Sequence, residues 1–166
     1  MLSPSDLFPL ESGYFFYTSD DRYFNIYFTY YTIEYQVNEE LKSEEYLMIG
    51  VEQIPNLPKA YSHEELSKND TKPTEEIDTA LTTAIKNFFA KNPHEVLIYL
   101  LSTESGKQAA RKRRFTRIVD KLGDDIICFN YEFDGEYPDT GFLVLTDNPD
   151  TDNLEAIFDE YVRQFS

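Results

Sequence analysis

The sequence is poor in the residues that build covalent cross-links and most catalytic centres. Cys128 is the only cysteine, so an internal disulfide is impossible and a disulfide-stabilised secreted scaffold is excluded. The two histidines, His63 and His94, have no metal-ligand spacing to the cysteine or to each other. No complete nucleophile or cofactor motif occurs in the chain. We therefore expect a protein that is not an enzyme and that holds neither a metal ion nor a cofactor.

Positive charge is also scarce, because 15 Lys and Arg residues stand against 31 Asp and Glu, which gives a net charge of −16. Such a surface repels nucleic-acid phosphate, so a nucleic-acid partner is disfavoured and a basic protein partner is favoured. The same acidity would also serve solubility alone. Long apolar runs are missing, which argues against a membrane partner, and residues 1–10 do not resemble a signal peptide. The expected location is the cytoplasm.

Aromatic residues, by contrast, are abundant, with 13 Tyr and 13 Phe among 166 residues. This composition and length are typical of a globular domain with a substantial core. Strand-like and helix-like patterns alternate along the chain, which predicts a single α+β domain over residues 1–166. We expect a mixed, mostly antiparallel sheet with about three helices covering one face. The polar loop 55–72 is a candidate sub-boundary, and two small lobes meeting near residue 60 are the alternative.

The N-terminal third has the alternation of antiparallel strands. Strands are predicted over 14–18, 23–37 and 46–54, with an acidic turn over 38–45. In the long strand, side chains alternate between two faces of the sheet. The residues expected to face the core are Phe24, Ile26, Phe28 and Tyr30.

The other face of the long strand carries tyrosines. Tyr23, Tyr27, Tyr31 and Tyr35 would form an exposed ladder there, and we name the first three as an interface for a partner, because tyrosine is favoured at protein interfaces. In the alternative, a helix covers this face and the hydroxyl groups bond at its rim.

The rest of the chain alternates between helices and strands. Proline and glutamate mark one helix start, Asn-Pro marks its end, and glycine marks the end of the next helix. The continuous apolar run after the first helix predicts a central strand covered on both faces. The expected elements are a helix from Pro73 to Asn92, a strand over 96–101, a helix over 108–122 closed by Gly123, strands over 125–133 and 142–146, and a last helix beginning at Asp152.

Seven of the fifteen basic residues lie in the segment 102–122. Arg111 falls on the apolar stripe of the predicted helix, so it needs an anionic companion. A carboxylate of the same sheet is one candidate for that companion. A bound anion at the helix N-terminus is the other. The residues predicted to hold such an anion or a partner are Ser102, Ser105, Lys107, Gln108, Arg111 and Arg114.

The outer side of the same helix forms a basic stripe. Arg113 and Arg117 are predicted to lie there, as is Lys121. A charged outer side is common to surface helices, but against a net charge of −16 it could also dock an acidic partner, another copy of the chain or a nucleic-acid backbone.

This segment also resembles a known family. The pattern is Gly-Lys/Arg-Gln-x-x-Arg-x-Arg/Lys-x-Phe after an apolar residue and Tyr, and the matching residues are Tyr99, Gly106, Lys107, Gln108, Arg111, Arg113 and Phe115. It is similar to the central signature of a small uncharacterised bacterial family, a domain of unknown function found mainly in Bacteroidetes. The aromatic hairpin over 13–28 is similar too, whereas residues 116–119 depart from the family's aromatic-rich helix end. The resemblance implies a compact bacterial domain and no particular activity.

Two functional hypotheses follow. The first is a non-enzymatic protein that binds another macromolecule, as an immunity, antitoxin or defence-associated module does. Its expected partner is another protein, with a basic one favoured, and self-association stays open. The second is a sensor of a small anion or nucleotide that uses the loop and helix start over 102–111.

Overall fold

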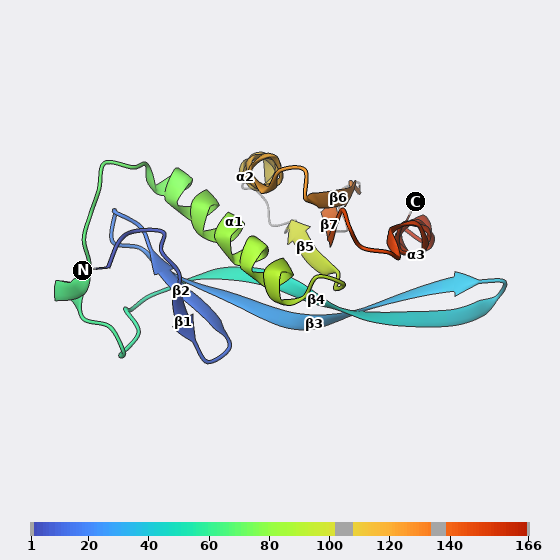
Figure 1. Ribbon diagram of the computed structural model, residues 1–166, viewed down its shortest axis with the longest axis horizontal. Helices are drawn as coiled ribbons and strands as arrows, with labels where there is room; N and C mark the ends of the chain where they lie inside the picture. The colour runs from blue at the N-terminus through green and yellow to red at the C-terminus, as the bar shows by residue number, and fades with distance from the viewer. Residues whose placement is uncertain (1, 102–107, 134–138, 166) are drawn as a thin grey trace. The chain divides into compact units, whose positions relative to one another are not determined.

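The computed structural model describes residues 2–101, 108–133 and 139–165, and its strands form a seven-stranded mixed sheet. The strand order is β1-β2-β3-β4-β5-β7-β6; β4 and β5 pair in parallel, whereas the pairs β1–β2, β2–β3, β5–β7 and β6–β7 are antiparallel. The α+β class predicted from the sequence is confirmed. The elements (Figure 1) are β1 (Phe8–Leu10), β2 (Gly13–Tyr17), β3 (Tyr23–Val37), β4 (Glu40–Ile54), the 3-10 helix η1 (His63–Glu65), α1 (Pro73–Lys91), β5 (Leu97–Leu101), α2 (Gln108–Leu122), β6 (Ile126–Tyr131), β7 (Asp139–Leu145) and α3 (Thr151–Arg163).

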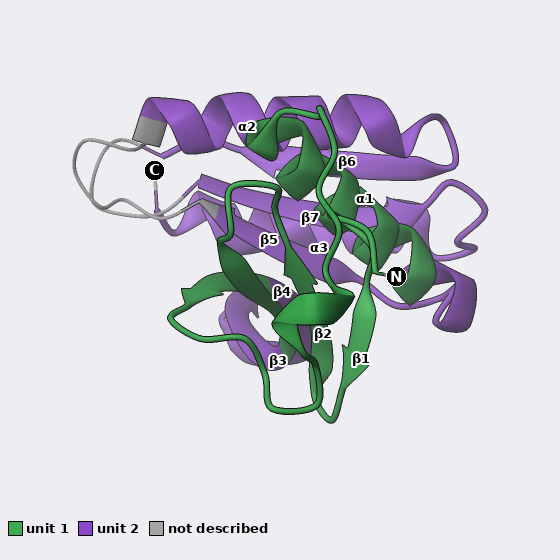
Figure 2. Cartoon of the chain, turned by 90° about the vertical axis from the view of Figure 1, so that its left-hand side faces the viewer, with its two compact units in different colours: residues 1–28, 50–88 green, residues 29–49, 89–166 purple. Residues whose placement is uncertain are grey.

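The chain divides into two compact units (Figure 2). The first contains residues 1–28 and 50–88, and the second contains residues 29–49 and 89–166. The long strands β3 and β4 run through both units, and α1 ends in the second. The loop 55–72, named above as a candidate boundary, lies wholly inside the first unit.

In the first unit, aromatic side chains cover both faces of the sheet. Phe15 is fully buried on one face, where its ring lies 5.2 Å from that of Tyr61 in the loop that follows β4. On the opposite face, Phe28 of β3 stacks on Phe88 of α1 with 5.5 Å between ring centroids. The helix pattern that begins at Pro73 therefore packs through its predicted apolar stripe.

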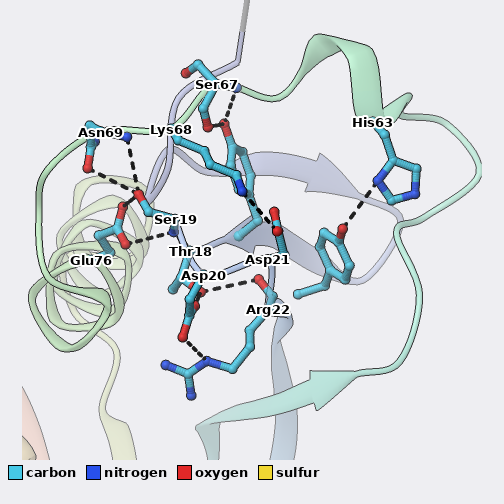
Figure 3. A network of polar contacts seen from close by, with 12 residues as sticks. Thr18, Ser19, Asp20, Asp21, Arg22, His63, Ser67, Lys68, Asn69 and Glu76 are labelled. Carbon is cyan, nitrogen blue, oxygen red and sulfur yellow. Dashed lines mark hydrogen bonds and ion pairs between the residues drawn. The ribbon is translucent and has the colours of Figure 1, made fainter.

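A polar network in the first unit ties the β2–β3 turn to the start of α1 (Figure 3). Glu76, only 1% exposed, accepts hydrogen bonds from the backbone N–H and the Oγ of Ser19, at 2.9 and 2.8 Å. Nearby, the Asp20 carboxylate accepts a hydrogen bond from Thr18 and pairs with Arg22 at 2.9 Å. Burial raises the pKa of Asp20, but Thr18 and Arg22 outweigh it and hold that pKa below its ordinary value. Because these groups satisfy one another, the network stabilises the unit.

In the second unit, α2 and α3 contact opposite faces of the same strands. Tyr99 of β5 packs on Phe115 of α2, with 4.8 Å between ring centroids. The next side chain back along β5, Ile98, belongs to the core cluster around Phe158 of α3. Successive residues of a strand point to opposite faces. The prediction of a central strand covered on both faces is therefore confirmed for β5, and the expectation that the helices share one face is wrong in this unit.

The hairpin between β3 and β4 is tighter than predicted. The acidic turn expected over 38–45 reduces to Asn38 and Glu39, whose φ angles are 53° and 67°, and β4 begins at Glu40. Two consecutive left-handed residues form the turn whose twist matches that of paired strands. Glycine usually occupies the second position of such a turn. Because Glu39 stands there instead, the sequence pattern did not predict the turn. The short strand β1 was also not predicted.

Cys128 in β6 gives a simple test of packing in the second unit. Burial raises the pKa of its thiol from the ordinary value of 9.0 to about 12. Only the thiolate is nucleophilic, so each unit of pKa lowers the reactive fraction tenfold in mildly alkaline buffer. Alkylation by iodoacetamide, followed by mass spectrometry, should be about 1,000-fold slower in the folded chain than in urea. Equal rates in both states would contradict the burial of this thiol.

Candidate functional site

The anion site predicted around Arg111 is only partly within the described residues. Ser102, Ser105 and Lys107 lie outside them, and Gln108 is the first residue of α2. The apolar face of α2 is as predicted, because Phe115, Ile118 and Leu122 are buried. Arg111 and Arg114 are half-buried, and both have interaction partners. The anion site itself therefore stays a prediction.

The outer side of α2 is basic, as the sequence predicted. Arg113 is exposed and Arg117 is half-buried, and with Ala109, Lys112 and Thr116 they line a shallow hollow of about 560 Å³. Glu132 pairs with Lys112 at 2.7 Å and, by this hydrogen bond, raises the pKa of the lysine. Part of the basic charge is thus balanced within the chain.

The tyrosines that were expected to form an exposed ladder are covered. Tyr23 and Tyr35 are 9% and 5% exposed, and Tyr27 and Tyr31 are half-buried. In the first unit, the Tyr23 hydroxyl lies 3.3 Å from Nδ1 of His63. In the second unit, the Tyr31 hydroxyl lies 3.5 Å from that of Tyr161 in α3. The exposed ladder is therefore wrong, and for Tyr31 the alternative of a covering helix with hydroxyl contacts is confirmed.

The opposite side of β3 is the one left open. Tyr30, expected in the core, is 73% exposed, and the same strand buries Ile33 completely. The reason is that α3 covers the odd-numbered side chains of β3 in the second unit, where Tyr31 and Ile33 join the cluster around Phe158. The even-numbered side chains there, from Tyr30 to Gln36, are exposed to solvent.

We call the two strands of this hairpin, residues 29–37 of β3 and 40–46 of β4, the arm. On one edge, β2 pairs with β3 only as far as Tyr27, and on the other, β5 pairs with β4 only from Leu47. The arm is therefore two strands wide, and its tip extends beyond α3 in Figure 1. Such an element has an open face and two open edges, the features by which sheets recruit other chains.

The open face of the arm combines apolar and acidic side chains. Tyr30 and Leu41 are the two large apolar side chains that are most exposed in the described residues, at 73% and 63%. From the two-residue turn, Leu41 lies opposite Gln36, about 20 Å from Tyr30 at the usual rise per residue. The exposed residues of this face are Tyr30, Thr32, Glu34, Gln36, Leu41, Ser43 and Glu45.

The charge of the arm is strongly one-sided. Residues 29–46 contain five glutamates and a single basic residue, Lys42. Lysine and arginine on a partner would therefore find opposite charge around the two apolar side chains. The sequence patterns did not predict this surface, although the change from apolar to polar even-numbered residues after Tyr30 marks its start.

Comparison of the chain with protein-family models, with curated proteins and with solved structures finds no match. The resemblance to the bacterial family therefore stays a prediction. No helix in the described part of the chain combines the length and apolar character needed to cross a membrane. Within residues 2–101, 108–133 and 139–165, no group of three or more His, Cys, Asp and Glu side chains is arranged to hold a metal ion.

Proposed function

We propose that this chain is a non-enzymatic protein-binding module, of the immunity or antitoxin kind, and that the open face of the arm docks a basic partner protein. The observation that carries the proposal is the joint exposure of Tyr30 and Leu41 on one uncovered face. A buried tyrosine in the centre of an interface is among the side chains that contribute most to binding. Tyr30 and Leu41 thus offer two separate apolar contacts on one face that is otherwise polar and acidic.

The electrostatics of the arm favour a basic partner over an acidic one. Glu34 and Glu45 lie between Tyr30 and Leu41 on the open face, and Glu39 and Glu40 lie at the tip. Opposite charge accelerates encounter and disfavours partners of the wrong sign. The net charge of −16 acts in the same direction at longer range.

A random peptide library displayed on phage provides the probe. We expect the immobilised chain to select peptides rich in lysine and arginine. Tyr30→Ser should weaken their binding, measured by fluorescence anisotropy, at least about 30-fold. Glu34→Lys should weaken peptide binding as well. The matched control is Glu75→Lys, which makes the same charge change at an exposed position of α1 and should leave peptide binding unchanged.

The outcomes separate cleanly. Selection of basic peptides that need Tyr30 and Glu34 supports the proposal. Selection of acidic peptides, equal binding by the Tyr30→Ser variant, or no enrichment at all would overturn it. Circular dichroism of each variant tests whether the fold is intact, which we expect because both positions are exposed.

A further inference from the structure

The edge of β3 in the arm presents backbone groups that no described strand pairs with. Val37 and Glu40 flank a two-residue turn, so they exchange the first pair of hydrogen bonds between the two strands. Pairing then alternates along the hairpin. Odd-numbered residues of β3 bond to β4, and the N–H and C=O groups of residues 30, 32, 34 and 36 point to the outer edge.

A hydrogen bond from α3 supports this register. The side-chain amide of Gln164, just after α3, donates to the carbonyl oxygen of Glu34 at 2.6 Å and to that of Tyr161 at 2.8 Å. Glu34 is even-numbered, so its carbonyl points outward as the register requires. A side-chain amide thus occupies one acceptor where a neighbouring strand would place a backbone N–H.

A groove runs beside this edge. The end of α3 and the edge of β3 enclose a hollow of about 420 Å³. Its lining includes Glu34, Gln36, Leu41, Glu160, Arg163 and Gln164. Arg163 pairs with Glu160 at 2.9 Å, and Glu34 adds a second carboxylate to the lining, so acidic side chains outnumber basic ones in the groove. A strand edge with a helix alongside can hold an extended peptide by backbone hydrogen bonds on one side and side-chain contacts on the other.

We propose that the outer edge of β3 receives an extended, basic segment of the partner as an added strand, lying in the groove beside α3. This inference rests on the proposed function, and it names how the partner binds. Backbone pairing with residues 30–36 would supply affinity independent of sequence. Alternate side chains of the added strand would point towards the α3 side and towards the open face that carries Tyr30 and Leu41. The added strand would displace the Gln164 amide from the Glu34 carbonyl.

Proline substitution separates edge pairing from face contacts. Thr32→Pro removes an N–H that points to the outer edge of β3, so the hairpin keeps its own bonds while the edge loses a donor and gains a bulky ring. Ser43→Pro is the matched control, because Ser43 is odd-numbered in β4 and its N–H points to the opposite edge of the same arm. Both positions are exposed. Thermal unfolding of the two variants compares their folding directly.

The probe is a basic peptide selected as described above. We expect Thr32→Pro to weaken its binding at least about ten-fold, and Ser43→Pro to leave it within about two-fold of the parent chain. Hydrogen exchange measured by NMR should show new protection of the amides of residues 30, 32, 34 and 36 when the peptide binds. This second measurement needs no variant and therefore does not depend on the fold of the proline variants.

These measurements can contradict strand addition while leaving the proposed function supported. If Tyr30→Ser weakens the peptide while Thr32→Pro does not, and the outer amides gain no protection, the partner docks on the face and strand addition is wrong. If Ser43→Pro is the variant that loses binding, the added strand belongs to the other edge and the inference is wrong as well. If no basic peptide binds, the proposed function itself fails.

Discussion

Alanine at position 158 should lower the free energy of unfolding by about 3–5 kcal/mol, the largest loss that we expect from a single substitution. Phe158 of α3 is fully buried. Its ring stacks on Phe142 of β7 at 4.1 Å and meets Tyr46 of β4 at 6.1 Å, nearly edge-on. Removing the ring leaves a cavity where α3, β4 and β7 meet. Urea unfolding followed by circular dichroism measures the loss.

Phe165→Ala is the matched control for this prediction. Phe165 is a half-buried phenylalanine near the end of the chain, with rings at 5.2 and 5.6 Å from those of Tyr161 and Phe133. The same truncation there removes less buried surface, so it should cost clearly less. Equal losses at the two positions would show that Phe158 is not the centre of this core.

Alanine at position 13 should destabilise the first unit by about 3 kcal/mol, because the added methyl group meets backbone. A Cβ on Gly13 would lie 1.9 Å from the carbonyl oxygen of Ile26, which belongs to the neighbouring strand β3. Gly13 pairs with Tyr27 at the end of the β2–β3 ladder. Neither strand can move aside without breaking that pairing, so the substitution should also lower the midpoint of thermal unfolding.

Gly50→Ala provides the comparison. A Cβ there would lie 2.3 Å from the ring of Tyr27, which is a side chain and only half-buried. The ring can turn away, so we expect a loss of about 1 kcal/mol. A larger loss at position 50 than at position 13 would contradict the argument that fixed backbone is the stricter neighbour.

The sequence predicted element positions better than it predicted what covers them. Pro73 and Gly123 mark helix boundaries, and Gly123 has the positive φ of 79° that its role after α2 requires. The bounds of β3 are as predicted, 23–37. These features depend on local backbone chemistry, which neighbouring residues determine. Local sequence patterns therefore predicted most of the helices and strands.

Tyr30 shows where local patterns fail. Alternation correctly grouped it with Phe24, Ile26 and Phe28 on one face of β3, but α1 covers that face in the first unit only. In the second unit α3 covers the other face. Periodicity assigns residues to faces, whereas the covering element comes from distant sequence. The arm could not be predicted for the same reason, since it begins where the pairing of β2 with β3 ends.

The division of the chain has a consequence for inheritance. Each compact unit is assembled from two separate stretches, and the polypeptide passes between the units at 28/29, 49/50 and 88/89. No single cut in the gene could therefore release either unit alone, because a cut at 88/89 divides the second unit and a cut at 28/29 divides the first. Because a single crossover always divides at least one unit, we expect the two units to be inherited together.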